Sequence, residues 1–227
     1  PDRFFRGTVY LPSVVKRAPA DVDPPYQPYI GSREMFVATD GDGVYRSTDA
    51  GQTWSASPAS FTSMQVTALA FLPGGGGTVL AGTDAAGLQR SDDGGRTWSF
   101  VDSGLPRGAG QTVRALRVSP AFASDRTVFA ATSSGLWASR DGGATFTRTT
   151  GPADARVLAI SPAYASDRTL LCDGQLSEDA GATWRPLPGA EQYSWTAAAF
   201  SPDYATDKTV WWGTDDISLE QRYGLRK

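Results

Sequence analysis

Three arginines in this 227-residue chain have the type and spacing to bind an anion. Arg114 and Arg117 lie within one mostly apolar segment, and Arg156 precedes the next segment of the same kind. A guanidinium group holds several N–H donors in a rigid planar fork, so three of them could bind a carboxylate or a sulfate. The alternative, which we favour, is pairing with Asp or Glu between neighbouring sheets, because charges near a core are usually paired.

The sequence contains no histidine, which excludes several kinds of site. Histidine is the commonest general base and the commonest metal ligand. Ser-His-Asp hydrolysis and His-ligated zinc are therefore excluded, and we expect no catalytic residue, no metal and no cofactor. The single cysteine, Cys172, cannot form a disulfide within the chain, and we expect it to be a small buried apolar side chain.

Tryptophans gather near the end of the sequence, at Trp195, Trp211 and Trp212. Their rings could stack on sugar rings, or they could pack against an incoming strand or a neighbouring subunit. We favour packing. Because successive strand residues point to opposite faces, Trp211 and Trp212 cannot both face the same core.

An eight-residue motif, Ser-x-Asp-x-Gly-x-Thr-aromatic, occurs four times, and its aromatic residues stand 44, 48 and 38 residues apart. This spacing is typical of four-stranded propeller blades. We expect a structural role, in which Asp accepts backbone hydrogen bonds, Gly permits a positive φ and the aromatic ring is buried. The four copies comprise Ser47, Asp49, Gly51 and Trp54; Ser91, Asp93, Gly95 and Trp98; Ser139, Asp141, Gly143 and Phe146; and Ser177, Asp179, Gly181 and Trp184.

Each repeat also contains an apolar strand A, a second apolar strand B, and a C–D hairpin that carries the motif. Strand A is predicted to line the axis, and the three arginines fall on or beside it. A second motif links A to B at residues 119–127, 161–169 and 201–209, and we expect its adjacent acidic and basic residues to make local turn contacts.

The eight-residue motif resembles the Asp-box, or BNR repeat, of sialidases, xyloglucanases, sortilin-type receptors and photosystem assembly factors. The resemblance extends over residues 33 to 214 and implies an all-β propeller with the motifs on outer hairpins. Sialidases use an arginine triad to hold a substrate carboxylate, which gives Arg114, Arg117 and Arg156 their interest. This chain lacks the Arg-Ile-Pro motif, the sixth blade and the long loops of sialidases, and no pair of carboxylates suits a xyloglucanase. We therefore expect no enzyme activity.

Five B strands predict a five-bladed propeller over residues 33–227 with an incomplete last blade. Residues 19–32 read as a proline-rich linker, and residues 1–18 as a strand that supplies the missing fourth strand of the last blade. This strand would either close its own ring or pair with a neighbouring subunit by β-augmentation. The interface residues expected for it are Val9, Tyr10, Leu11, Val14 and Val15.

The charge pattern limits the partners. Net charge is -3 and the basic residues are dispersed, so we expect no nucleic-acid partner; no apolar run is long enough to cross a membrane. The overall interpretation is a secreted or cell-surface structural, assembly or interaction module that binds itself or another surface protein. The alternative is a carbohydrate- or anion-binding propeller, followed by a sialidase-like glycoside hydrolase.

Overall fold

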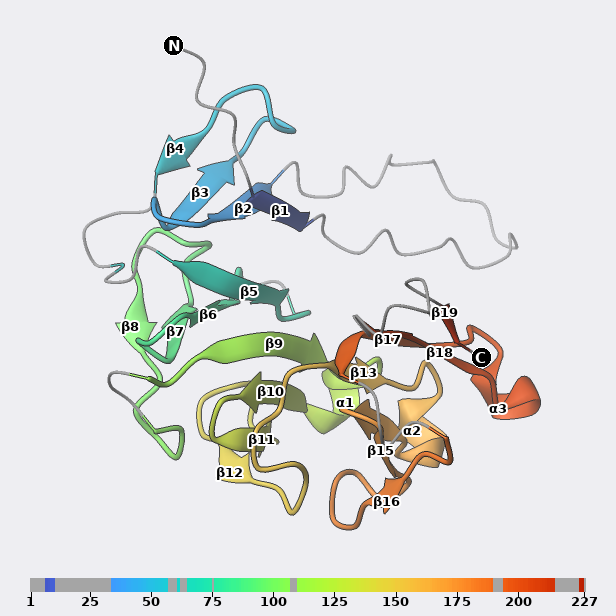
Figure 1. Ribbon diagram of the computed structural model, residues 1–227. Helices are drawn as coiled ribbons and strands as arrows, with labels where there is room; N and C mark the ends of the chain where they lie inside the picture. Colours follow the sequence, from blue (N-terminus) through green and yellow to red (C-terminus); the bar gives the residue numbers. More distant parts are fainter. Residues whose placement is uncertain are drawn as a thin grey trace, which may run out of the picture.

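The chain folds into antiparallel β-sheets, as its repeats predict. The computed structural model describes residues 7–10, 34–56, 61, 65–74, 76–106, 110–189, 194–214 and 225–226. These residues form five sheets, four of them with four strands and one with three. In Figure 1 the sheets follow one another in chain order along an arc, from the first sheet at the upper left to the fifth at the right. This arrangement is consistent with the blades of a propeller.

The strands of each sheet are consecutive in the chain. The first sheet contains β1 (Gly7–Tyr10), β2 (Met35–Thr39), β3 (Val44–Ser47) and β4 (Ser55–Ala56). The second contains β5 (Val66–Phe71), β6 (Val79–Thr83), β7 (Leu88–Ser91) and β8 (Ser99–Phe100). The third contains β9 (Val113–Val118), β10 (Val128–Thr132), β11 (Gly135–Ser139) and β12 (Thr147–Arg148).

The last two sheets continue this order. The fourth contains β13 (Leu158–Ile160), β14 (Leu170–Cys172), β15 (Gln175–Ser177) and β16 (Arg185–Pro186). The fifth contains β17 (Trp195–Phe200), β18 (Val210–Thr214) and β19 (Leu225–Arg226). The inner strands β5, β9, β13 and β17 contact one another in this order.

The eight-residue motif closes each hairpin between the third and fourth strands with side-chain hydrogen bonds. In the first copy the Ser47 hydroxyl donates to Asp49 Oδ1 (2.7 Å) and accepts from the Gly51 N–H (2.8 Å). The Asp49 carboxylate also accepts from the Thr53 N–H (2.9 Å) and hydroxyl (2.5 Å). The same bonds recur in residues 91–98, 139–146 and 177–184. The bonds are those expected of Asp in the motif, whereas the expected burial of the aromatic ring holds for Trp98 and Phe146 and not for Trp54.

Three connections between the first and second strands of a sheet are short helical turns. They are α1 (Phe122–Asp125), α2 (Tyr164–Asp167) and α3 (Tyr204–Asp207). In α1, Asp125 accepts from the Ser119 hydroxyl (2.7 Å) and the Thr127 N–H (2.9 Å). The Arg126 guanidinium lies 5.5 Å from the centre of the Phe122 ring. Both members of the acid–base pair thus make local turn contacts, the acid with Ser and Thr and the base with an aromatic ring.

The N-terminal strand lies in a different sheet from the one predicted. Gly7–Tyr10 pairs antiparallel with β2, with Val9 opposite Val37 and Tyr10 opposite Phe36, so it is the first strand of the first sheet. The prediction that this segment completes the last blade is therefore wrong for residues 7–10. A strand-forming composition predicts that the segment is a strand, but does not determine which sheet edge it joins. Leu11, Val14, Val15 and the linker at 19–32 lie outside the described residues.

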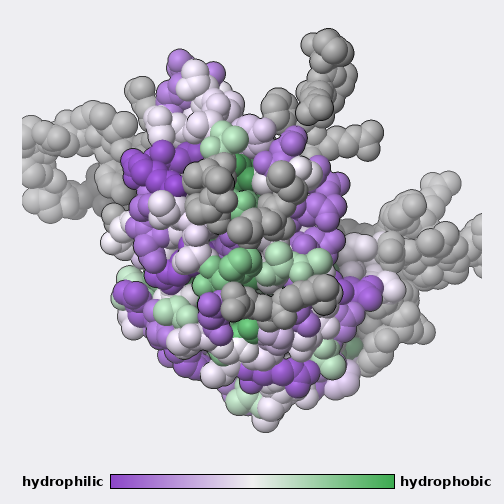
Figure 2. All heavy atoms as spheres, turned by 90° about the vertical axis from the view of Figure 1, so that its left-hand side faces the viewer, coloured by the Kyte–Doolittle hydropathy of each residue, from purple (hydrophilic) through white to green (hydrophobic). Residues whose placement is uncertain are grey.

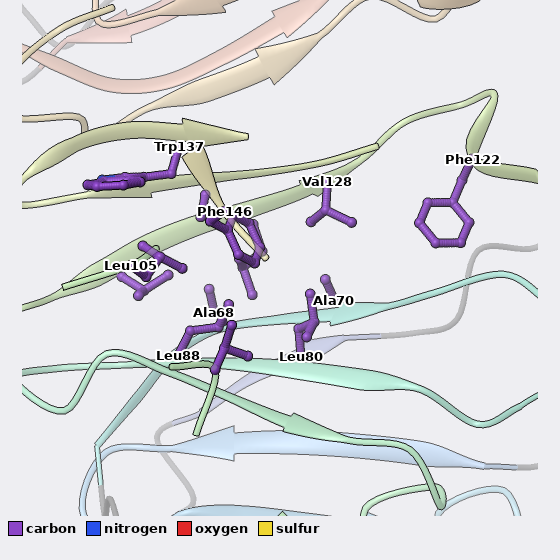
Figure 3. Packing of buried hydrophobic residues seen from close by; sticks show 13 residues of the cluster. Ala68, Ala70, Leu80, Leu88, Leu105, Phe122, Val128, Trp137 and Phe146 are labelled. Carbon is purple, nitrogen blue, oxygen red and sulfur yellow. The ribbon is translucent and has the colours of Figure 1, made fainter. Parts of the chain in front are cut away.

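The hydrophobic core consists of layers between neighbouring sheets. Between the second and third sheets, Leu80 and Leu88 face Val128 and Phe146 (Figure 3), and all four side chains are buried. Equivalent layers lie between the first and second, third and fourth, and fourth and fifth sheets. Each interior sheet therefore has an apolar layer on both of its faces.

The face of the molecule that looks to the left in Figure 1 is largely polar where its residues are described. Figure 2 shows hydrophilic residues over most of the face seen from the left of Figure 1, with a narrow band of apolar residues across its middle. Among the described residues, no helix is long and apolar enough to span a membrane. Extensive contacts join each sheet to the next, and none of that extent joins the described parts of the first and fifth sheets.

Candidate functional site

A cavity of about 240 Å³ lies among the innermost strands. Residues of β5, β9, β13 and β17 line it, so it belongs to the centre of the arc rather than to one sheet. Arg114, Arg117 and Arg156 all line this cavity, and the structure thus brings the three predicted arginines together. Its other described lining residues are apolar except for Thr196, so none of the residues known to form the wall carries a carboxylate.

Asp154, in the connection from the third to the fourth sheet, pairs with two of these arginines. Arg114 Nη1 bonds to Asp154 Oδ1 and donates to the Ala155 carbonyl at 3.1 Å. Arg156 Nη2 lies 3.2 Å from Asp154 Oδ2. The hydrogen bond from Arg114 outweighs partial burial and holds the pKa of Asp154 below its ordinary value. The interpretation of these arginines as ion-pair partners is confirmed for Arg114 and Arg156.

Arg117 differs from the other two arginines. Arg117 Nη1 donates to the backbone carbonyl of Leu116 at 3.0 Å, and Arg117 is exposed to solvent. Three guanidinium groups therefore stand at one cavity, and Asp154 pairs with two of them. Guanidinium groups gathered in this way suit an anion, because bidentate hydrogen bonds from them are strongest with charged acceptors.

The carboxylates of the eight-residue motif are engaged in their own hairpins. Hydrogen bonds from Thr53 and Ser47 lower the pKa of Asp49 from 3.8 to about 2, and the equivalent bonds from Thr183 and Ser177 do the same for Asp179. For Asp141, burial raises the pKa, yet the combined hydrogen bonds lower it to about 2. Hydrogen bonds from Thr97 and Ser91 lower the pKa of Asp93 in the same way. These groups stay ionised and bound to their own turns, which makes them poor proton donors.

The three tryptophans predicted as a sugar-binding or packing site do not lie together: two form a buried pair and the third is separate. Trp195 and Trp212 stack with ring centroids 5.3 Å apart, and both are buried in the layer between the fourth and fifth sheets. Trp211 points to the other face of β18, as strand geometry requires, and is half-buried. The three tryptophans therefore do not form one exposed platform.

Cys172 is fully buried in β14, as expected from its sequence context. Burial, with a further contribution from the neighbouring Asp173, raises the pKa of its thiol. A thiol in this environment is a weak nucleophile. Within the described part of the chain, no group of three or more Cys, Asp or Glu residues is placed to hold a metal ion.

Sequence reasoning missed Asp154 and the exposed aromatic residue Trp54. Asp154 stands two residues before Arg156, and this spacing was the available signal for an ion pair at the entrance of strand β13. Trp54 is 39% exposed, although its motif is identical in pattern to the one that buries Trp98. The difference arises from the neighbouring sheet, which a single repeat does not encode.

Comparison with known proteins agrees with the hairpin geometry. A family model described as the BNR/Asp-box repeat matches residues 45–56 and 89–100. The chain carries BNR/Asp-box repeats. The third and fourth Asp boxes have the same hydrogen bonds as the two matched copies. No curated protein matches this chain.

Several solved structures share its fold. The GH74 xyloglucanase from Xanthomonas campestris is 21% identical with a TM-score of 0.65, and the match covers 85% of this chain and 34% of that one. The GH74 enzyme from Niastella koreensis is 18% identical, with a TM-score of 0.59 and the same two coverages of 85% and 34%. YCF48 bound to D1 peptide is 16% identical with a TM-score of 0.57, covering 87% of this chain and 66% of YCF48. The Asp-box chain thus spans about a third of the GH74 proteins.

Proposed function

We propose that this Asp-box chain is a non-catalytic structural or interaction module, with its five sheets acting as five blades around the central cavity. The state of its carboxylates carries the proposal. Glycoside hydrolysis commonly needs two carboxyl groups about 5 to 9.5 Å apart, one of which acts as an acid. The described residues of the cavity wall contribute none, Asp154 is held by Arg114 and Arg156, and the Asp-box carboxylates are held in their hairpins.

A hydrolysis assay tests this proposal. The purified chain is incubated with xyloglucan and with a sialylated trisaccharide, and new reducing ends and free sialic acid are measured over a day. We expect no product above a protein-free control. Product formation that is lost in Asp154→Asn and kept in Asp102→Asn, an exposed carboxylate that does not line the cavity, would contradict the proposal.

We also propose that the module works outside the cell or on its surface. Its single thiol supports this location, because Cys172 is buried and would not cross-link chains under oxidising conditions. Fractionation of the producing cells tests the proposal: the chain is expected in the medium or on protease-accessible surfaces, and a protease-protected intracellular pool would contradict it.

Anion binding at the cavity is a second candidate function, and the arginine cluster favours it. The cavity is lined by Arg114, Arg117 and Arg156, so a sugar acid or sulfate would find guanidinium donors from two sheets. Calorimetric titration with glucuronic acid and with sulfate would measure this. Arg117→Ala is expected to weaken binding at least tenfold, whereas Arg148→Ala, at the outer strand β12, leaves it unchanged. Equal binding by both variants would remove this candidate.

A further inference from the structure

Every sheet of the array has two faces, and at each end of the array one face has no neighbouring sheet among the described residues. We call the face that packs against the next sheet in the chain the forward face, and the face that packs against the preceding sheet the backward face. In β14, Leu171 belongs to the layer with the fifth sheet, whereas Leu170 and Cys172 belong to the layer with the third. The alternation of side chains along the strand assigns each residue to one face.

Each forward face has one large apolar residue at the second position of the second strand of its sheet. These residues are Phe36, Leu80, Phe129 and Leu171, and each is at most 2% exposed. Phe129 contacts Tyr164 of the fourth sheet edge to face, with ring centroids 5.8 Å apart. Trp211 occupies the same register in β18 and is half-buried, with Ala199 exposed opposite it. The fifth sheet therefore presents a forward face of the usual type that no other described sheet covers.

The first sheet shows the converse: its backward face is the one that no described sheet covers. In the third sheet the backward residues Val128 and Ala130 are fully buried, whereas the equivalent Met35 and Val37 are half-buried. The Asp-box aromatic of the first sheet, Trp54, is 39% exposed. Its counterparts in the second and third sheets, Trp98 and Phe146, are 6% and 2% exposed.

In the second and third sheets a preceding sheet covers this aromatic residue, whereas Trp184 in the fourth sheet is half-buried. Phe61, which follows the first sheet, packs edge to face on Trp98 at 5.1 Å, and Phe36 fills the space beside Gly95, with Cε1 2.7 Å from where a Cβ would stand. In the third sheet the Phe146 N–H donates to the carbonyl of Ser103 at 2.9 Å. Gly51 in the first box instead has Met35 and Trp54 of its own sheet as its nearest side chains.

We infer that a second copy of this chain covers these faces, with the forward face of its fifth sheet, centred on Trp211, packed against the backward face of the first sheet, formed by Met35, Val37 and Trp54. The occupant follows from repetition. Four forward-to-backward contacts of this type join the described sheets, and the first and fifth of these sheets present one unmatched face of each kind. Because the two faces differ, the contact is head-to-tail and propagates into closed rings or filaments. The inference rests on the proposed role as an interaction module and names its partner.

Two charge variants test the contact. Trp54→Arg disables the backward face and Trp211→Arg disables the forward face, while Ser99→Arg places the same charge on an exposed position of β8 as a matched control. Mass is measured by light scattering from micromolar to millimolar concentration, after circular dichroism has verified the fold of each variant. Wild type and Ser99→Arg are expected to grow beyond the 24.1 kDa monomer, and each tryptophan variant to remain monomeric.

Mixing the two tryptophan variants gives the decisive result. Each retains one intact face, so an equimolar mixture is expected to form dimers and nothing larger. A wild-type chain that stays monomeric throughout, or a tryptophan variant that still grows, would overturn the inference. A monomeric wild type that also fails to hydrolyse the test glycans leaves the proposed function standing, whereas hydrolysis dependent on Asp154 overturns that function whatever the mass.

Discussion

The interior and end sheets are built from the same repeat, yet the second strand of the sheet is buried to different extents in the two kinds. All residues of β6 and β10 are buried on both faces, whereas burial alternates along β18 and two of the five residues of β2 are partly exposed. The Asp-box hairpins of both kinds of sheet contain the same hydrogen bonds, between the same motif positions. The comparison separates two levels of structure: the repeat determines its own hairpin, and the neighbouring sheet determines what is buried.

The largest expected effect contrasts Phe129 with Trp211, which share one register. Phe129→Ala empties a fully buried site in the third sheet and should lower the free energy of unfolding by about 3 to 5 kcal/mol. Trp211→Ala removes a half-buried side chain and should cost less than about 2 kcal/mol in the monomer. Urea unfolding at low protein concentration measures both. Equal losses would show that the forward face of the fifth sheet is covered within one chain.

The Asp-box aromatic residues give the next contrast. Trp98→Ala should cost about 3 to 5 kcal/mol, because its ring is buried beneath Phe61 and Phe36. Trp54→Ala should cost about 1 kcal/mol or less, since much of its ring already contacts water. Thermal unfolding of the two variants orders them. A larger loss for Trp54 would refute the assignment of an uncovered backward face.

The Asp boxes of the end sheet and of the interior sheets should lose their stabilising effect over the same range of acid pH. The folded pKa values of Asp49 and Asp141 lie below the ordinary value of 3.8, so their stabilisation is complete above about pH 4 and is lost as the pH falls through about 2. The unfolding temperature should therefore decline from about pH 4 downward. Asp49→Asn and Asp141→Asn should each reduce this decline by similar amounts. An effect confined to Asp141 would tie the hairpins to the neighbouring sheets.

The smallest effect concerns Cys172 in the interior fourth sheet. Because the thiol is buried and its pKa is raised, an aromatic disulfide reagent should react with it at the rate of global unfolding rather than of local opening. Absorbance of the released thiolate follows the reaction across urea concentrations. Fast labelling without urea would mean that the interior opens locally, contrary to the comparison.

Much of the fold could be predicted from local sequence. Three strands, Val66–Phe71, Val113–Val118 and Trp195–Phe200, are the apolar inner strands that the repeat predicts, and each Asp box closes its own hairpin. The strand Gly7–Tyr10 was predicted as a strand but assigned to the wrong sheet, because two sheets lacked a strand and propensity does not choose between edges.

The candidate site was predictable to a lesser degree. Strand register places Arg114, Arg117 and Arg156 at the axis, and the cavity brings them together. The role of Asp154 depends on the path of a loop. Trp54 is exposed because no described sheet packs on the backward face of the first sheet. Long-range packing of this kind leaves no mark in the repeat itself.

Hydrogen exchange at two protein concentrations tests the central claim most directly. The account predicts that amides of β2 and β18 exchange more slowly at millimolar than at micromolar concentration, while amides of β6 and β10 are unchanged. Protection that is independent of concentration in all four strands would contradict the claim that the end faces are docking surfaces for a second copy.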